Sequence, residues 1–114
     1  MFERLEVTRM AHALAAHASA RQSVIANNVA HADTPGYHAR EVEEFADHLR
    51  RLRTEPAAAP RLLRPPPGAT LSPNGNSVSI ETEMMKAVDA RHRFEKALAI
   101  TQSVTGIIRT SLGR

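Results

Sequence analysis

The sequence predicts a mostly α-helical chain, with two long helices at its ends and an irregular middle. Apolar residues recur at steps of three or four in residues 1–30 and again in residues 77–114, and this spacing is typical of one face of a helix. Six of the seven prolines lie between Pro56 and Pro73, where they interrupt regular structure. We therefore expect two long terminal helices able to pair in coiled-coil fashion, a short middle helix and a Pro-rich irregular loop, within a single domain of residues 1–114.

Residues 1–30 are expected to form the N-terminal helix. Its apolar stripe is narrow and alanines occupy much of the remainder, so another helix can approach it closely. Arg21 interrupts the stripe, which consists of Val7, Met10, Leu14, Ala18, Ile25 and Val29. A narrow seam of this kind predicts a helical partner.

A tight turn is expected where this helix ends. Asn27 and Asn28 leave right-handed helical geometry more readily than most residues, so we expect them to weaken the helix there. Pro35 has the φ required at the second position of a tight turn, and Gly36 can adopt the positive φ of a type II turn. Tyr37 then supplies a ring to bury and a hydroxyl that can form a hydrogen bond.

The section of residues 31–53 is predicted to contain this turn, an extended piece and a short helix. Residues 37–42 are expected to be extended, and residues 43–52 to form a helix with Phe45, Leu49 and Leu52 on one side. The adjacent acids Glu43 and Glu44 are interpreted as part of the solvated face of that helix.

Residues 54–76 are predicted to be an irregular or disordered loop with polyproline character. Pro65, Pro66 and Pro67 raise the alternative of a PxxP-type ligand, but segments of this composition are mostly linkers. We interpret the segment as a flexible linker.

The C-terminal section, residues 77–114, has clear helix-start signals. Asn74 and Gly75 form a turn signal, Ser79 is a suitable N-cap, and Glu81 and Glu83 lie where the helix dipole favours negative charge. The following stripe has a heptad rhythm and consists of Ile80, Met84, Ala87, Arg91, Phe94, Leu98, Thr101, Thr105, Ile108 and Leu112. Flanking residues widen it, so the helix has more apolar surface than one partner can cover, which predicts association with other subunits.

The composition and the motifs of the chain argue against enzymatic activity and against a metal or cofactor site. The 114 residues include three Phe, one Tyr and no Trp, so an isolated monomer should be marginally stable. Cysteine is absent, and His12 and His17 are five residues apart, which puts them on different faces of a helix. Neither a nucleophile elbow nor a P-loop is present. We expect no enzymatic activity, no catalytic residue, no cofactor or metal, and no small-molecule substrate.

A small Arg-rich helical nucleic-acid-binding protein is the alternative from a different class. Thirteen of the fifteen basic residues are arginines, and those that would contact phosphates are Arg50, Arg51, Arg53, Arg61 and Arg64. Acids are interleaved with them, and aromatics for base stacking and a helix-turn-helix pattern are missing. We therefore expect no nucleic-acid partner.

Membrane insertion is not predicted either. No stretch of the sequence is long and apolar enough to span a bilayer. Glu3 and Glu6 occupy the region where a cleavable signal peptide has its apolar run. We expect any export to use a route without a cleaved signal peptide.

Two separated motifs resemble one known family. The runs Ala26–Ala30 (ANNVA) and Asp33–Tyr37 (DTPGY) resemble the N-terminal signature of bacterial flagellar rod and hook axial proteins. In the other half, Gly75–Glu81 (GNSVSIE), followed by Glu83-Met84 and Arg93-Phe94, is similar to a proximal rod component of that family. His31 stands where the family usually has asparagine, and Phe94 where it usually has tyrosine.

The resemblance implies a structural subunit of the flagellar basal-body rod, located in the periplasm and exported by the flagellar type III system. Terminal helices would assemble into a helical tube that transmits torque, through self-association and contacts with other proximal rod proteins, the rod-to-ring adaptor and the export gate. Another axial rod component is the alternative within the family. The motif residues are Asn27, Asn28, Thr34, Pro35, Gly36 and Tyr37. The expected helix assembly interface is Leu14, Ile25, Met84, Phe94, Leu98 and Ile108.

Overall fold

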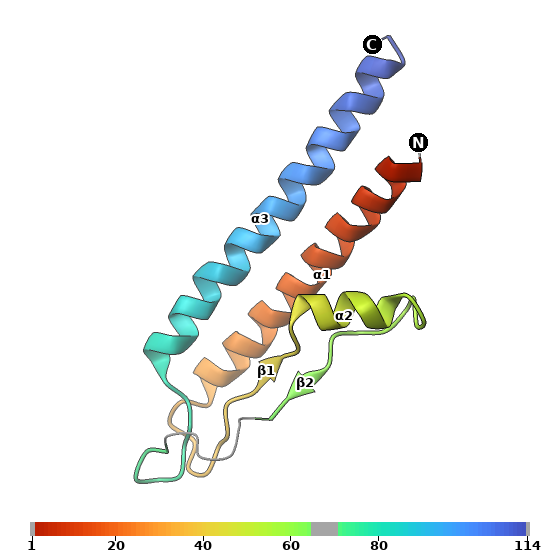
Figure 1. Cartoon of the computed structure of the whole chain (residues 1–114). Helices are drawn as coiled ribbons and strands as arrows, with labels where there is room; N and C mark the ends of the chain where they lie inside the picture. Colours follow the sequence, from red (N-terminus) through yellow and green to blue (C-terminus); the bar gives the residue numbers. More distant parts are fainter. Residues whose placement is uncertain (1, 65–70, 114) are drawn as a thin grey trace.

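The protein folds as an elongated antiparallel helical hairpin with a small arm on its side. The structure is a computed structural model that describes residues 2–64 and 71–113. Helices α1 (Phe2–Ala30) and α3 (Ile80–Ser111) run side by side with both chain ends at the same end of the hairpin (Figure 1). The molecule measures 64 × 28 × 17 Å. The predicted fold class is confirmed.

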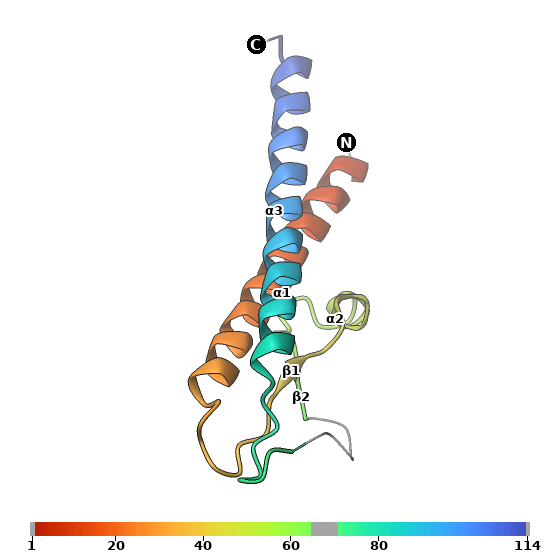
Figure 2. The ribbon, with the colours of Figure 1, turned by 90° about the vertical axis from the view of Figure 1, so that its left-hand side faces the viewer.

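The arm comprises one short helix and two strands. β1 (Glu41–Val42) pairs antiparallel with β2 (Leu62–Leu63), and α2 (Phe45–Leu52) lies between them in sequence. α2 lies across α1 instead of alongside it, and a view turned by 90° shows it end-on beside the hairpin (Figure 2). The arm therefore leaves one side of the hairpin open.

Small residues form the seam between α1 and α3. Ala11 and Ala18 of α1 and Ala90 and Ala97 of α3 are all at most 2% exposed. Alanine has no side chain beyond Cβ, so it lets two helix backbones approach closely. The seam of the hairpin is thus an alanine seam, closed by larger residues such as Ile25.

The predicted stripes and the buried seam coincide only in part. Ala18 and Ile25 are buried as expected, but Met10 is 49% exposed, and on α3 Met84 and Leu98 are 63% and 46% exposed. Close packing of the two backbones selects the face with the smallest side chains. Many of the larger apolar residues of both helices, such as Met10, Met84 and Leu98, consequently remain at the surface.

The helix ends follow local sequence signals. The Ser79 hydroxyl accepts a hydrogen bond from the Thr82 backbone N–H at 3.4 Å, which confirms Ser79 as the N-cap of α3. Gly113 has φ 74° just after the helix, a conformation that ends helices and favours glycine. None of the helices in the described part of the chain is long and apolar enough to cross a membrane.

The prediction of an irregular loop over residues 54–76 is wrong in two places. Leu62–Leu63 forms strand β2 against β1, and Asn76 is 2% exposed with hydrogen bonds to the opposite side of the hairpin base. Both depend on partners far away in sequence. Pro65, Pro66 and Pro67, the residues of the PxxP alternative, lie outside the described residues.

Candidate assembly site at the base of the helical hairpin

The side chain of Asn28 is the centre of a hydrogen-bond network at the base of the hairpin. Asn28 is fully buried. Its Oδ1 accepts hydrogen bonds from the Tyr37 hydroxyl and from the Arg40 backbone N–H, both at 3.0 Å. Its Nδ2 donates to the Arg40 carbonyl at 2.8 Å and to Glu83 Oε1 at 2.5 Å. All four hydrogen-bonding positions of the amide are filled, so this one side chain joins α1, the segment after the turn and α3.

The two asparagines of the motif have different environments. α1 continues through both of them to Ala30, and no non-glycine residue among those described has a positive φ. The side chain of Asn27 is exposed, while its carbonyl accepts hydrogen bonds from the backbone and ring N–H groups of His31. The role of Asn28 is therefore to satisfy buried partners, a role that its helix propensity did not reveal.

The turn after α1 has the predicted geometry. The Tyr37 backbone N–H donates to the Thr34 carbonyl at 3.3 Å, with Pro35 and Gly36 at the two central positions. Gly36 has φ 73°, the positive value that a type II turn requires at its third residue. The Tyr37 ring stacks on His31, with ring centroids 4.7 Å apart. His31 thus packs against the tyrosine that completes the motif.

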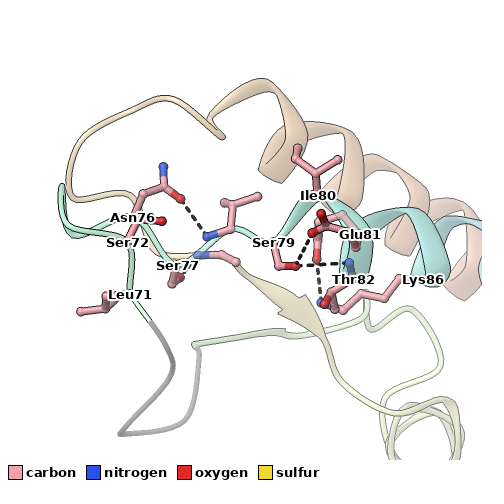
Figure 3. A pocket seen from close by; sticks show the side chains of 12 residues that line it. Leu71, Ser72, Asn76, Ser77, Ser79, Ile80, Glu81, Thr82 and Lys86 are labelled. Atoms are coloured by element: carbon pink, nitrogen blue, oxygen red, sulfur yellow. Dashed lines mark hydrogen bonds and ion pairs between the residues drawn. The ribbon is translucent and has the colours of Figure 1, made fainter.

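The segment leading into α3 is bound directly to this turn. Asn76 Nδ2 donates to the carbonyls of His31 and Thr34 at 2.8 and 2.7 Å. The Gly36 backbone N–H donates to the Asn74 carbonyl at 2.9 Å. Figure 3 shows Asn76 and Ser77 on this segment, with Ser79 at the start of the helix. No sequence signal predicts the burial of Asn76, because a single asparagine in a Ser- and Gly-rich segment has no local feature that indicates it.

The two turns also touch through their glycines. Gly75 has φ 82°, and a Cβ added to it would lie 3.4 Å from the Gly36 Cα. A side chain at position 75 would therefore meet both an unfavourable backbone conformation and the main chain of the neighbouring turn. The two sequence motifs that carry the family resemblance are in contact in the folded chain.

A chain of charged groups runs from the network up the hairpin. Lys86 Nζ lies 2.9 Å from Glu83 and 3.2 Å from Glu41. Arg21 lies 3.4 Å from Glu41 and 2.6 Å from Asp89. Burial disfavours the charged form of Lys86, but its hydrogen bond to Glu83 and the charge of Glu41 outweigh this and raise its pKa. The Arg21 hydrogen bond lowers the pKa of Asp89. Opposite charges therefore link α1, β1 and α3.

The interpretation of Glu43 as a solvated residue is wrong. Glu43 precedes α2 and is 6% exposed. Its carboxylate forms an ion pair with Arg51 and accepts the Arg61 backbone N–H at 3.0 Å. The hydrogen bond from Arg51 is the main cause that lowers the pKa of Glu43 to about 2. Glu44 is exposed, as predicted.

Two buried histidines attach the arm to α1. His17 Nε2 donates to the Glu43 carbonyl at 2.6 Å, and His48 Nε2 donates to the Ala58 carbonyl at 3.0 Å. The two rings stack with centroids 6.0 Å apart, and Phe45 packs edge-on against His17. Within the described residues, no group of three or more His, Cys, Asp or Glu side chains is placed to hold a metal ion. These histidines pack α2 onto α1.

The six residues of the predicted helix interface do not share one environment. Ile25 is 5% exposed and lies inside the hairpin, while Leu14 and Phe94 are half-buried. Met84, Leu98 and Ile108 are exposed, the first by 63%. Three of the six residues therefore lie on the exposed surface of α3, where they can contact another molecule. One of the six packs inside the chain itself.

An open hollow of about 700 Å³ lies beside the first turn of α3. Its lining includes Leu71, Ser77, Ile80 and Lys86 (Figure 3). Small-molecule sites usually enclose most of their ligand, and this hollow is open to solvent. Of its charged lining residues, Glu83 and Lys86 are already engaged in the network of the hairpin base.

Together these features define a helical structural protein. Buried polar side chains hold the base of the hairpin together, and large apolar side chains of both helices lie at the surface. Surfaces of this kind are typical of subunits that associate through their helices.

Comparison with known proteins agrees with this class. Residues 11–38 match the family of flagella basal body rod proteins. The chain is 29% identical to the flagellar basal body rod protein FlgB of Escherichia coli (strain K12), over 77% of this chain and 80% of the relative, and the same values hold for FlgB of Shigella flexneri. The chain is therefore similar to flagellar basal-body rod proteins, and to FlgB over most of its length. It is a structural subunit of the rod.

Proposed function

We propose that this chain is a subunit of the proximal rod whose terminal helices interlock with those of neighbouring subunits to form a helical tube. The observation that carries this proposal is the division of side chains in the hairpin. Alanines fill the seam between α1 and α3, while Met84, Leu98 and Ile108 are 63%, 46% and 44% exposed on α3. A monomer has no use for such an exposed stripe, and a neighbouring helix would cover it.

The same stripe supports a role in torque transmission. Moving one subunit relative to its neighbours would expose apolar surface to water, at a cost of about 25 cal/mol per Å². A tube held in this way resists twisting along its whole length. The half-buried Leu14 and Phe94 would contribute from the edges of the seam, while Ile25 packs inside the hairpin, so that contacts within and between subunits are continuous.

The motif at the hairpin base would set the direction in which the chain leaves the tube wall. Asn28, Thr34 and Tyr37 form hydrogen bonds there, Pro35 and Gly36 shape the turn, and the exposed Asn27 side chain remains free to contact a neighbour. In this proposal the chain works as one domain. Residues 1–30 and 77–114 supply the tube helices, residues 31–53 the turn, β1 and α2, and residues 54–76 the connection that includes β2 and the buried Asn76.

The partners in this proposal are other copies of the chain, the other proximal rod proteins, the rod-to-ring adaptor and the export gate. The subunit would reach the periplasm through the flagellar type III channel without a cleaved signal peptide. A hairpin with an alanine seam suits this route, because little apolar surface has to be exposed to separate its helices before passage.

The test is a matched pair of lysine substitutions in a strain that lacks the chromosomal gene. Leu98→Lys places a charge on the exposed stripe, and Ser103→Lys places the same charge on another side of α3, also at an exposed position. We expect both variants to keep their helical circular dichroism. Only the Leu98 variant should fail to restore swimming in soft agar and rods in electron micrographs of basal bodies. Normal rods with Leu98→Lys would contradict the proposal.

A further inference from the structure

The alanine seam by itself does not determine how α1 and α3 are aligned along their axes. Ala11 and Ala18 are seven residues apart on α1, and Ala90 and Ala97 are seven residues apart on α3. Sliding one helix by seven residues, about 10 Å, again places an alanine of α1 opposite an alanine of α3. Apart from Ile25, which lies one heptad after Ala18 and is 5% exposed, the apolar part of the seam is therefore compatible with more than one register.

Glu83 breaks this repeat. It lies one heptad before Ala90, so it occupies the next seam position of α3, and it is 1% exposed. Its Oε1 accepts the hydrogen bond from Asn28 Nδ2 at 2.5 Å, and its Oε2 accepts one from Lys86 Nζ at 2.9 Å. A slide of one heptad would separate Glu83 from Asn28. Glu83 would keep Lys86 on its own helix, but its Oε1 and the Asn28 Nδ2 would each lose a partner in a buried position, which costs more than an alanine contact returns.

The neighbouring contacts of the helices agree with the same alignment. Arg21 of α1 binds Asp89 of α3 at 2.6 Å, and Asp89 lies six residues after Glu83 on α3. That pair is partly exposed, so water can replace it at little cost. The main-chain hydrogen bonds at the hairpin base lie outside the two helices. Within the seam, the Asn28–Glu83 contact is the buried interaction that distinguishes one register from another.

We infer that Glu83 specifies the register of α3 against α1, acting through Asn28. A single polar residue at a seam position is an established way to fix register in coiled coils. Register decides which exposed side chains of the two helices stand at the same level. Glu83 would thereby determine the composite surface that the hairpin presents, although it is itself hidden. The inference concerns the single chain and does not rest on the proposed assembly.

The test measures the distance between two spin labels by pulsed electron paramagnetic resonance. The chain has no cysteine, so labels can be attached at Gln22→Cys and Ser103→Cys, two exposed positions at different levels of the hairpin. In this background Glu83→Ala extends the alanine repeat, Glu83→Gln keeps an acceptor for Asn28, and Glu81→Ala is a control at an exposed position of the same turn.

The parent, Glu83→Gln and Glu81→Ala proteins should each give one distance. Glu83→Ala should give a second population displaced by up to roughly 10 Å. Relative to the parent, its share should rise at least roughly tenfold, equivalent to about 1.4 kcal/mol. A single native distance in a helical Glu83→Ala protein would overturn the inference and assign the register to the base.

An unfolded variant would not prevent a decision. If Glu83→Ala loses its helical signal in buffer, the distances are measured after refolding with trimethylamine N-oxide, which favours compact states. A second population would again support the inference. A single native distance, or a chain that stays unfolded in the osmolyte, would make Glu83 a residue of general stability and overturn it.

Discussion

Asn28→Ala is the substitution whose effect can be worked out most directly from the structure. It removes four hydrogen bonds at once, to the Tyr37 hydroxyl, to both backbone groups of Arg40 and to Glu83. The Tyr37 hydroxyl can turn towards water and Glu83 keeps Lys86. The two Arg40 backbone groups then remain as the partners most poorly satisfied. A buried group without a partner costs about 1–3 kcal/mol, so for the two groups we expect a loss of about 2–6 kcal/mol.

A loss of this size is a large fraction of the stability of a small domain, which is about 5–15 kcal/mol. Urea unfolding followed by circular dichroism measures it as a lower midpoint. Asn27→Ala is the matched control, because it changes the same residue type one position earlier, where the side chain is exposed. That change should be within about 0.5 kcal/mol. Equal losses in the two variants would refute the assignment of Asn28 as the centre of the base.

Two further predictions concern the turn and the arm. Gly36→Val should abolish rod assembly and motility, because Gly36 has φ 73°. Gly36→Asn is the control, since asparagine tolerates that φ, and it should still swim in soft agar. Swimming of the Gly36→Val variant would disprove the role of the turn. The pKa of Glu43 is lowered to about 2 in the folded chain, so its ionised form adds stability above the unfolded pKa near 4.3, and this contribution is lost as the pH falls from about 5 towards 2. Glu43→Gln should therefore reduce the change of the urea midpoint with pH over that range, and Glu44→Gln should not. If both variants show the same pH dependence of the midpoint, the ion pair does not stabilise the fold.

Features that depend on neighbouring residues could be predicted from the sequence. The Ser79 cap and the Pro35-Gly36 turn arise from the preferences of those residues themselves, and both appear as expected. The extent of α1 follows from a pattern carried by many residues. In each case the information lies within a few positions of the feature it determines.

The buried faces of the helices could not be predicted in the same way. The heptad pattern of α3 identifies its largest apolar residues, among them Met84 and Leu98, but packing against α1 selects Ala90 and Ala97. In an alanine-rich helix, no local signal separates an alanine in a seam from one at the surface. The pattern therefore described the outer surface of the hairpin more than its seam.

The buried polar residues could not be predicted from their neighbours in the sequence either. Glu83 and Asn28 are 55 residues apart in sequence, and Asn76 reaches carbonyls 42 and 45 residues away. A carboxylate in the first turn of a helix has a sufficient local explanation in the helix dipole, which hides its second role. The spacing of His17 from His12 argues against a shared metal site, but no local signal indicates that the rings of His17 and His48 pack α2 onto α1.

The surface area of the chain connects the hairpin to its association with other subunits. Its accessible surface is 8241 Å² for 12.5 kDa, whereas a compact monomer of this mass exposes about 6,200 Å². The surplus, about 2,000 Å², is comparable to the area buried in a stable protein–protein interface. A chain with such a surplus gains stability from any partner that covers it. We therefore expect the melting temperature, followed by circular dichroism, to rise with protein concentration from the micromolar to the millimolar range. A concentration-independent transition would show that the hairpin is stable alone and that its exposed stripe does not drive self-association.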